Sequence, residues 1–312
     1  MDKISNQFVN IFNYLPARES TKSLELANKI KGNSCSLNSV YDNIAGVPYQ
    51  KHISTDGDFN MVGGAEFDRI RIKSIKGHID KKWVKSNNAF IKANTLIVQN
   101  IIAHIIYPIE HIKITACIPS NEHIGTTTLS NTVNQLILKD LDNIKISNKY
   151  TWCILNSKLI NWYVYRFVFS LAIRTMHFYS PISEKVPFIF QDVNQQPFIT
   201  LADTMLEKKK ELHQIRNAFL EFVIGQFVIT KQSTKLQDWY ILSFEDFLKE
   251  LEKAKVKLTA TQKFDLNPLF EREKTKALEI KLIIDKTDKE IDKMVYEIYG
   301  LTEEEIKIVE GV

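Results

Sequence analysis

The chain contains 312 residues, of which 44% are hydrophobic, and its formal net charge at pH 7 is +4. This length allows one large domain or two ordinary ones, and this hydrophobic content is ordinary for a globular protein with a sizeable core. The longest apolar stretches, such as Ile101–Tyr107, are too short for a membrane span, and no signal-peptide pattern or disulfide framework is present, so we expect a cytoplasmic protein.

Positive charge is concentrated in the middle of the chain. Residues 32–190 carry seventeen Lys and Arg side chains against eleven Asp and Glu, whereas residues 191–312 carry nineteen against twenty-three. This division favours an anionic partner for the middle section. An ordinary solvated surface explains the same counts equally well.

The predicted elements begin with a helical lead-in over residues 1–36, with helices at Lys3–Tyr14 and Thr21–Ile30. Strand-like runs bounded by Gly, Pro, Asn and Asp follow at Asp58–Val62, Arg69–Ile72, Leu96–Gln99, Ile112–Cys117 and Thr132–Leu138. The pattern then predicts a strand or strand start at Lys149–Leu155 and an aromatic-rich helix at Ser157–Ser170.

The run that follows Gly63-Gly64 has the most informative pattern. Arg69, Arg71 and Lys73 alternate with two isoleucines. In a strand, period-2 alternation places the cations on one face and the isoleucines on the other. The apolar face can then join a core while the basic face meets an anion such as nucleic acid.

After Pro197 the chain becomes helical and highly charged. Apolar side chains recur at heptad-like spacing, first at Leu201, Met205, Leu212, Ile215, Phe219 and Phe222, and later at Ala277, Ile280, Ile284, Thr287, Ile291, Met294 and Ile298. This rhythm predicts two long helices that pair antiparallel, the second beginning near Pro268. A capping sequence at Ser243 predicts a short helix between them, Gly300 ends the second long helix, and Thr302 caps a last short one.

Several short motifs together resemble a known family. They are Gly63-Gly64 followed by Arg69, Leu96–Gln99 followed by Ala103-His104 and Pro108, Leu155–Ile160, Pro197–Asp203 and Ile291–Ile306. In order and spacing, the chain is similar to the target-recognition domain of N6-adenine DNA methyltransferases. It most resembles the TaqI-like C-terminal specificity domain of type IIG restriction–modification enzymes, and more distantly the HsdS specificity subunit of type I systems.

The resemblance implies a mixed α/β (α+β) fold, with a DNA target-recognition domain over residues 37–196 and a helical spacer over residues 197–312. It implies double-stranded DNA as one partner and a methyltransferase or endonuclease catalytic domain or subunit as the other, which the heptad helices could dock. The residues expected at the DNA are Lys51, Gly63, Gly64, Arg69, Arg71, Lys73, Lys76, Gln99, Asn100, Lys113 and Arg174. The carboxamides of Gln99 and Asn100 can read adenine edges, and the cations can contact phosphates.

The chain has no complete catalytic motif of an N6-adenine methyltransferase. Such an enzyme needs a Gly-rich loop for S-adenosylmethionine and an Asn/Asp-Pro-Pro-aromatic motif. Asn267-Pro-Leu-Phe270 lacks the second proline, and a helix start with Asn267 as its cap explains it. We therefore expect no cofactor or metal in this chain, which is not an enzyme by itself. The S-adenosylmethionine, alone or with Mg²⁺, would belong to the partner catalytic domain.

Two alternatives from other functional classes stay open. The first is a nuclease with an unrecognised active site, which would cut DNA in the presence of Mg²⁺. The second is an interaction partner or inhibitor of a methyltransferase that does not bind DNA. Binding by that protein would lack the steep salt dependence that phosphate neutralisation imposes.

Overall fold

The computed structural model describes residues 19–107, 109–141, 145–173, 175–226 and 233–311. The chain divides into two units: unit 1 contains Met1–Ala202 and Ile291–Val312, and unit 2 contains Asp203–Glu290. The mixed α/β class predicted from the sequence is confirmed. The first boundary lies close to the predicted start of the spacer at residue 197, and residues 291–312 belong to unit 1.

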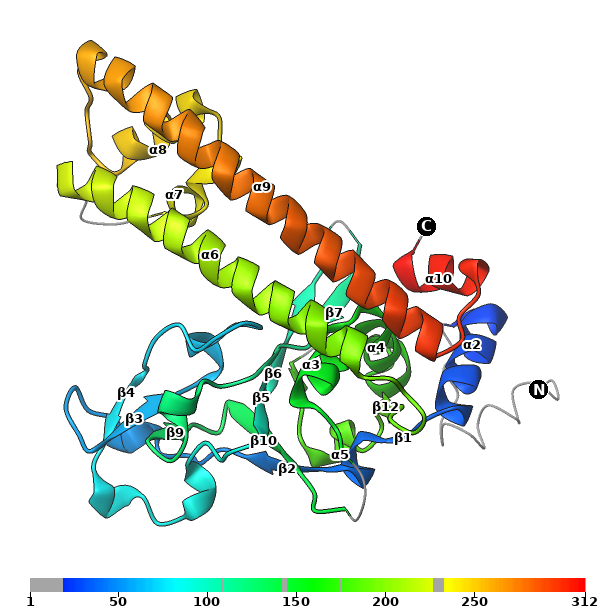
Figure 1. Cartoon of the computed structure of the whole chain (residues 1–312). Coiled ribbons are helices and arrows are strands. Elements are labelled where there is room, and N and C mark those ends of the chain that lie inside the picture. Colours follow the sequence, from blue (N-terminus) through cyan, green and yellow to red (C-terminus); the bar gives the residue numbers. More distant parts are fainter. Residues whose placement is uncertain (1–18, 108, 142–144, 174, 227–232, 312) are drawn as a thin grey trace. The chain divides into compact units, whose positions relative to one another are not determined.

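The described part of unit 1 contains four small sheets (Figure 1). The largest has the order β2 (Tyr41–Ala45), β10 (Val133–Leu138), β5 (Thr95–Gln99) and β8 (Ala116–Cys117). The others are β4 (Gly77–Ile79), β3 (Phe59–Val62) and β9 (Thr127–Leu129); β11 (Met176–His177), β6 (Ile101–Ile105) and β7 (His111–Lys113); and β1 (Cys35–Ser36) with β12 (Pro187–Phe188). The pairing is antiparallel except between β3 and β9. The strands predicted at Asp58–Val62, Leu96–Gln99 and Thr132–Leu138 are confirmed.

One face of the largest sheet forms a core with the neighbouring sheet. Ile97 and Val133 from β5 and β10 pack with Val62, Phe67, Ile91, Cys117 and Leu129. Residues 95–98 of β5 and 133–136 of β10 are all buried, so both faces of these two strands are covered. Burial raises the pKa of the Cys117 thiol, so this side chain acts as a small apolar group.

The strand predicted at Lys149–Leu155 is wrong, because these residues form part of helix α3 (Asn148–Asn156). The Ser147 hydroxyl caps α3 by accepting from Lys149 N at 3.2 Å. Residues 150–155 are all buried, so no polar face reveals the helical period in the sequence. Ser157 rather than Asn156 caps the next helix, α4 (Lys158–Tyr163), which continues into a π-helical turn at Val164–Val168.

The strand predicted at Arg69–Ile72 is also wrong: these residues form a tight turn. Asp68 Oδ1 accepts from the backbone N–H groups of Ile70 and Arg71, at 2.7 and 3.1 Å. An aspartate that bonds to the backbone two or three residues ahead favours a turn over a strand. Phe67 and Ile72 pair across this turn.

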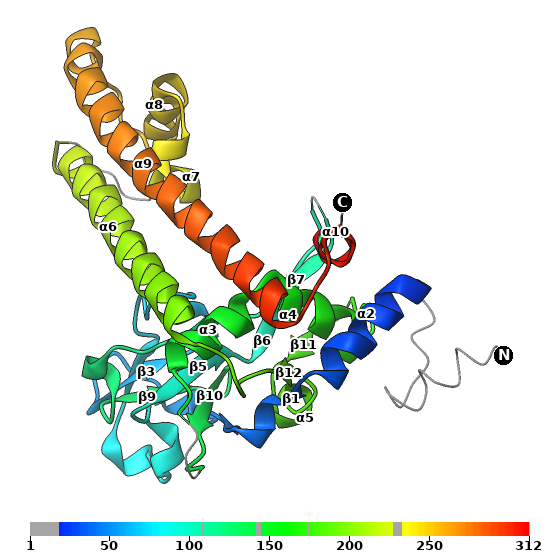
Figure 2. The same ribbon diagram turned by 45° about the vertical axis from the view of Figure 1, so that its right-hand side comes forward.

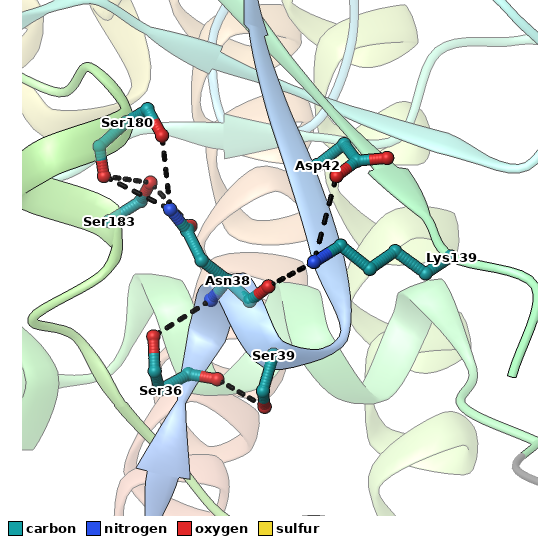
Figure 3. A network of polar contacts seen from close by, with 7 residues as sticks. All are labelled: Ser36, Asn38, Ser39, Asp42, Lys139, Ser180 and Ser183. Carbon is teal, nitrogen blue, oxygen red and sulfur yellow. Dashed lines mark hydrogen bonds and ion pairs between the residues drawn. The ribbon is translucent and has the colours of Figure 1, made fainter.

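A polar network fixes α5 (Ser180–Ser183) to the short helix η1 (Leu37–Ser39) (Figure 3). Asn38 Nδ2 donates to the backbone and hydroxyl oxygens of Ser180, each at 3.1 Å, and Asn38 Oδ1 accepts from Ser183 Oγ at 2.7 Å. Lys139 Nζ donates to Asn38 O and lies 3.6 Å from an Asp42 oxygen. The donors and acceptor of the Asn38 side chain are thus occupied, which makes this network a structural clamp.

Residues 291–312 contribute helix α10 (Glu303–Glu310) to unit 1. Figure 1 and Figure 2 show α10 beside α2 (Thr21–Gly32), and Lys29 Nζ lies 2.7 Å from Glu305 Oε2. Thr302 caps α10 as predicted. Gly300, expected to end the preceding helix, has a φ of +69°, a left-handed conformation that favours glycine.

Unit 2 contains parts of two long helices, α6 (Gln196–Gln226) and α9 (Ala260–Ile298), with α7 (Thr234–Gln237) and α8 (Phe244–Lys253) between them in the chain. Its core is an aromatic cluster made of Phe219, Trp239, Phe244, Phe247 and Phe270. The rings of Phe219 on α6 and Phe270 on α9 are 6.0 Å apart. The two long helices therefore meet here through aromatic side chains, of which Phe219 belongs to the predicted apolar positions and Phe270 does not. No described helix in the chain has the length and hydropathy that a membrane span needs.

Two details of the helical prediction are wrong. Helix α9 begins at Ala260 instead of near Pro268, because Thr259 and Gln262 cap it reciprocally, at 2.9 and 3.3 Å. Pro268 lies inside the helix and is tolerated there. Phe222, expected in the apolar seam, is 48% exposed, because Phe219 one turn earlier occupies the core position.

Candidate nucleic-acid interface

The turn Ser130–Thr132, between β9 and β10, is held by hydrogen bonds from two sides. We call it the Asn131 turn. Thr132 Oγ1 accepts from Gly64 N at 2.9 Å, and Thr132 O accepts from Asn100 N at 2.9 Å. Asn131 O accepts from Asn100 Nδ2 at 3.0 Å. These bonds fix the backbone of the turn and leave the Asn131 side chain exposed.

Gly46 brings a third segment against this turn. Gly46 N donates to Val133 O at 2.8 Å, and Val47 N donates to Leu129 O at 2.9 Å. A Cβ atom at Gly46 would lie 2.2 Å from Ser130 O and 2.6 Å from Leu129 O. Only glycine permits so close a backbone approach. This contact directs the following residues toward Asn131.

Gly46→Ala is expected to lower the stability of unit 1 by about 1–3 kcal/mol, because the added methyl group overlaps backbone that cannot rotate away. Chemical denaturation, monitored by circular dichroism, measures the change in the free energy of unfolding. The control is Gly32→Ala at the end of α2, where an added Cβ meets no atom within 4 Å. Equal effects of the two substitutions would contradict the proposed backbone overlap.

The short helix η2 (Gln50–His52) follows Gly46 and carries three different polar side chains. Gln50 Nε2 donates to Asn131 Oδ1. Lys51 is exposed and forms no ion pair with any described residue. The His52 ring stacks on the Trp83 ring, with the centroids 3.9 Å apart and the planes 16° apart. Consecutive residues of η2 thus present a carboxamide, a cation and an aromatic pair.

Contacts between the segment before β3 and the segment after β4 hold Trp83 in place. Trp83 belongs to η4 (Lys81–Trp83), and Asp58 Oδ2 accepts from Lys81 N at 2.7 Å. Residues Ser54 and His78 pair as an isolated bridge, which connects the segment after η2 to β4. Lys82 Nζ lies 5.8 Å from the centre of the Trp83 ring and 2.9 Å from an Asp80 oxygen. The aromatic pair therefore has a cation beside it.

We call the group formed by Gln50, Lys51, His52, Lys82, Trp83 and Asn131 the η2 surface. Lys76 is exposed and precedes Gly77, whose backbone lies against the residue after η2: an added Cβ at Gly77 would come within 2.4 Å of the Ile53 side chain. Cations, carboxamides and aromatic rings on one surface can contact phosphates, base edges and base faces.

Four of the residues predicted at the DNA lie around the Asn131 turn. Gly63 N donates to Glu66 Oε2 at 2.9 Å, and Gly64 N bonds to Thr132. Gln99 Nε2 donates to Gly64 O at 2.7 Å and to Phe67 O at 3.3 Å, which occupies both of its hydrogens. Asn100 Nδ2 donates to Asn131 O. The structure thus brings Gly63, Gly64, Gln99 and Asn100 together, as supports for the turn.

The predicted cations have different environments. The Arg69 guanidinium lies 4.6 Å from the centre of the buried Trp152 ring, and Arg69 O accepts from Trp152 Nε1 at 2.7 Å. Arg71 is partly buried in the same turn. Lys73, Lys76 and Lys113 are exposed, and none of them forms an ion pair with a described residue. Arg174 lies outside the described residues.

Sequence reasoning did not select Gln50, His52, Lys82, Trp83 or Asn131. Lys81-Lys-Trp83 is a short signal, because two cations before a tryptophan on an exposed loop are typical of an anion-binding surface. Gln50 and Asn131 carry no such signal. They are 81 positions apart in the chain, so only the folded structure relates them.

A second polar group lies at the loop end of the β6–β7 hairpin. His104 Nε2 is 2.9 Å from Glu110 Oε1 and 3.1 Å from Tyr165 OH. Burial and the hydrogen bond to Glu110 raise the pKa of Tyr165 to about 12, so its hydroxyl stays protonated near neutral pH. This group connects the hairpin to the π-helical turn. Among the described residues, no three His, Cys, Asp or Glu side chains are grouped so that they could hold a metal ion.

Comparison with known proteins gives one family match. Residues 191–295 match the model of a family described as a domain of unknown function, DUF8810. The match covers all of unit 2 together with residues 191–202 and 291–295 of unit 1, and it excludes the η2 surface. No curated protein matches the chain.

Proposed function

We propose that this protein is a sequence-specific DNA-recognition module of a restriction–modification system. It positions a separate adenine-N6 methyltransferase or endonuclease on its site and carries no catalytic centre of its own. The observation that supports DNA binding best is Lys51, an exposed cation between the fixed side chains of Gln50 and His52. The resemblance of the sequence motifs to target-recognition domains supports the restriction–modification context.

The proposal assigns two roles to the η2 surface. Lys51 and Lys76 neutralise phosphates: both are exposed and form no ion pair with a described residue, so they can release counterions from DNA without breaking such a contact. Asn131 and Gln50 lie beside Lys51 and can reach base edges in the same groove. Unit 2 serves as the spacer that connects the DNA-recognition domain to the catalytic partner.

The double substitution Lys51→Ala/Lys76→Ala is expected to weaken binding to duplexes of random sequence. It should also flatten the plot of log affinity against log salt concentration by about 2 units, close to 0.9 for each lost phosphate contact. Fluorescence anisotropy with labelled random duplexes at several salt concentrations measures the slope.

The matched control is Lys22→Ala/Lys286→Ala, which removes the same charge from exposed positions on α2 and α9. It should leave the slope nearly unchanged. If both double variants flatten the slope equally, binding is a property of net charge and the η2 surface is not the interface. If the wild-type protein shows no salt-dependent binding to duplex DNA, the proposed function is wrong.

A further inference from the structure

The carboxamides of Gln50 and Asn131 form a pair with a defined outward pattern. Each carboxamide has one acceptor oxygen and two N–H donors. Gln50 Nε2 donates to Asn131 Oδ1, and neither side chain makes another hydrogen bond to a described residue. The Asn131 amide hydrogens and the Gln50 carbonyl oxygen are therefore available. The pair presents one donor group and one acceptor group.

Both members of the pair sit on fixed backbone. The Asn131 turn is held by Gly64 and Asn100, and the segment before Gln50 is held by the Gly46 contact with Ser130. His52 N donates to Tyr49 O at 2.9 Å, which closes η2. Groups held in place before binding lose little conformational entropy on contact with a ligand.

The donor and acceptor pattern selects among the bases. In the major groove, adenine presents a donor at N6 next to an acceptor at N7, guanine presents two acceptors, and cytosine and thymine present one group each. An available amide N–H can donate to N7 while an available carbonyl accepts from N6. Adenine is the base whose edge complements one donor together with one acceptor.

We propose that the Gln50–Asn131 pair reads one adenine through its N6 and N7 atoms in the major groove. The inference rests on the proposed function, and it moves base reading away from Gln99 and Asn100. Gln99 has both of its donors bonded to backbone carbonyls. Asn100 donates to Asn131 O and so acts as a positioning residue for the reader.

The test begins with the wild-type full chain and a randomised duplex library, from which repeated gel-shift selection yields a preferred site. Each adenine of that site is then replaced in turn by 7-deazaadenine, which retains Watson–Crick pairing and lacks the N7 acceptor. We expect one replacement to weaken wild-type binding by about 5- to 150-fold, the range for loss of a bidentate base contact.

Asn131→Ala should weaken binding to the unmodified site by a similar factor and should show no further loss at the same 7-deazaadenine. This non-additivity identifies a direct contact between the side chain and that base. Asn131→Asp, which keeps the shape but replaces the donor, should behave like Asn131→Ala. The control Asn33→Ala removes an exposed carboxamide at the end of α2 and should retain full sensitivity to the modified base.

The outcomes separate this inference from the proposed function. If wild-type protein selects a site but Asn131→Ala binds it equally well, or loses the same factor on every sequence, the adenine reader is wrong and DNA recognition stands. A preferred site without adenine, or additive effects of Asn131→Ala and 7-deazaadenine, also overturns the reader. If the wild-type protein selects no site, both proposals are wrong.

Discussion

Trp152→Ala is expected to lower the free energy of unfolding of unit 1 by about 3–5 kcal/mol, the usual cost of truncating a large buried aromatic side chain. Trp152 is fully buried on α3, its ring stacks against the Arg69 guanidinium, and its indole N–H donates to Arg69 O. The substitution therefore leaves a cavity and removes the indole donor from Arg69 O, in the turn after Phe67. Chemical denaturation followed by far-ultraviolet circular dichroism measures the change.

The control for this substitution is Trp83→Ala. Trp83 is 39% exposed, and its ring stacks on the His52 ring at the surface. Its truncation should therefore lower the free energy of unfolding by about 1 kcal/mol or less. Trp152→Phe separates the two contributions at the buried site, because phenylalanine fills part of the volume and cannot donate to Arg69 O. A loss for Trp83→Ala as large as that for Trp152→Ala would contradict this account of the core.

Phe270→Ala is expected to destabilise unit 2 by about 3–5 kcal/mol. Phe270 is fully buried on α9, and its ring lies 4.9 Å from that of Phe247 and 5.6 Å from that of Trp239. The aromatic rings of this cluster come from α6, α8, α9 and the segment between α7 and α8, so the cavity removes contacts to several elements at once. Because unit 2 has its own core, its unfolding is best followed by hydrogen exchange of its amides.

The matched control lies on the same helix. Phe264→Ala removes an identical side chain that is 78% exposed, and it should change the stability by no more than about 0.5 kcal/mol. If the two phenylalanines were equally costly to remove, helix propensity rather than the aromatic cluster would determine the stability of α9.

The environment of Arg69 changes its expected role in DNA binding. In a strand with alternating cations it would lie on a solvated basic face, whereas in the structure it packs on Trp152 in a turn. Its charge sits beside an aromatic ring whose face attracts cations. We therefore expect Arg69 to support the fold near Gly64 and Gln99, and we assign the phosphate contacts of the proposed interface to exposed lysines such as Lys51.

Local signals in the sequence determined several elements of this protein. Ser243 and Thr302 cap α8 and α10, and Gly300 follows α9, because these signals act through hydrogen bonds within three or four residues. The runs that became β5 and β10 were predicted because they are apolar and bounded by turn residues. The heptad spacing in the last third of the chain predicted the two long helices.

Only the tertiary structure decided the rest. Residues 150–155 of α3 are buried on all sides, so no polar face reveals their helical period in the sequence. The turn at Arg69 is held by a residue 83 positions away in the chain, because Trp152 Nε1 donates to Arg69 O. The η2 surface exists because Gly46 allows two backbones to approach, which places Gln50 beside Asn131. A contact across 81 positions leaves no spacing pattern in the sequence, so the fold alone assembles the proposed reader.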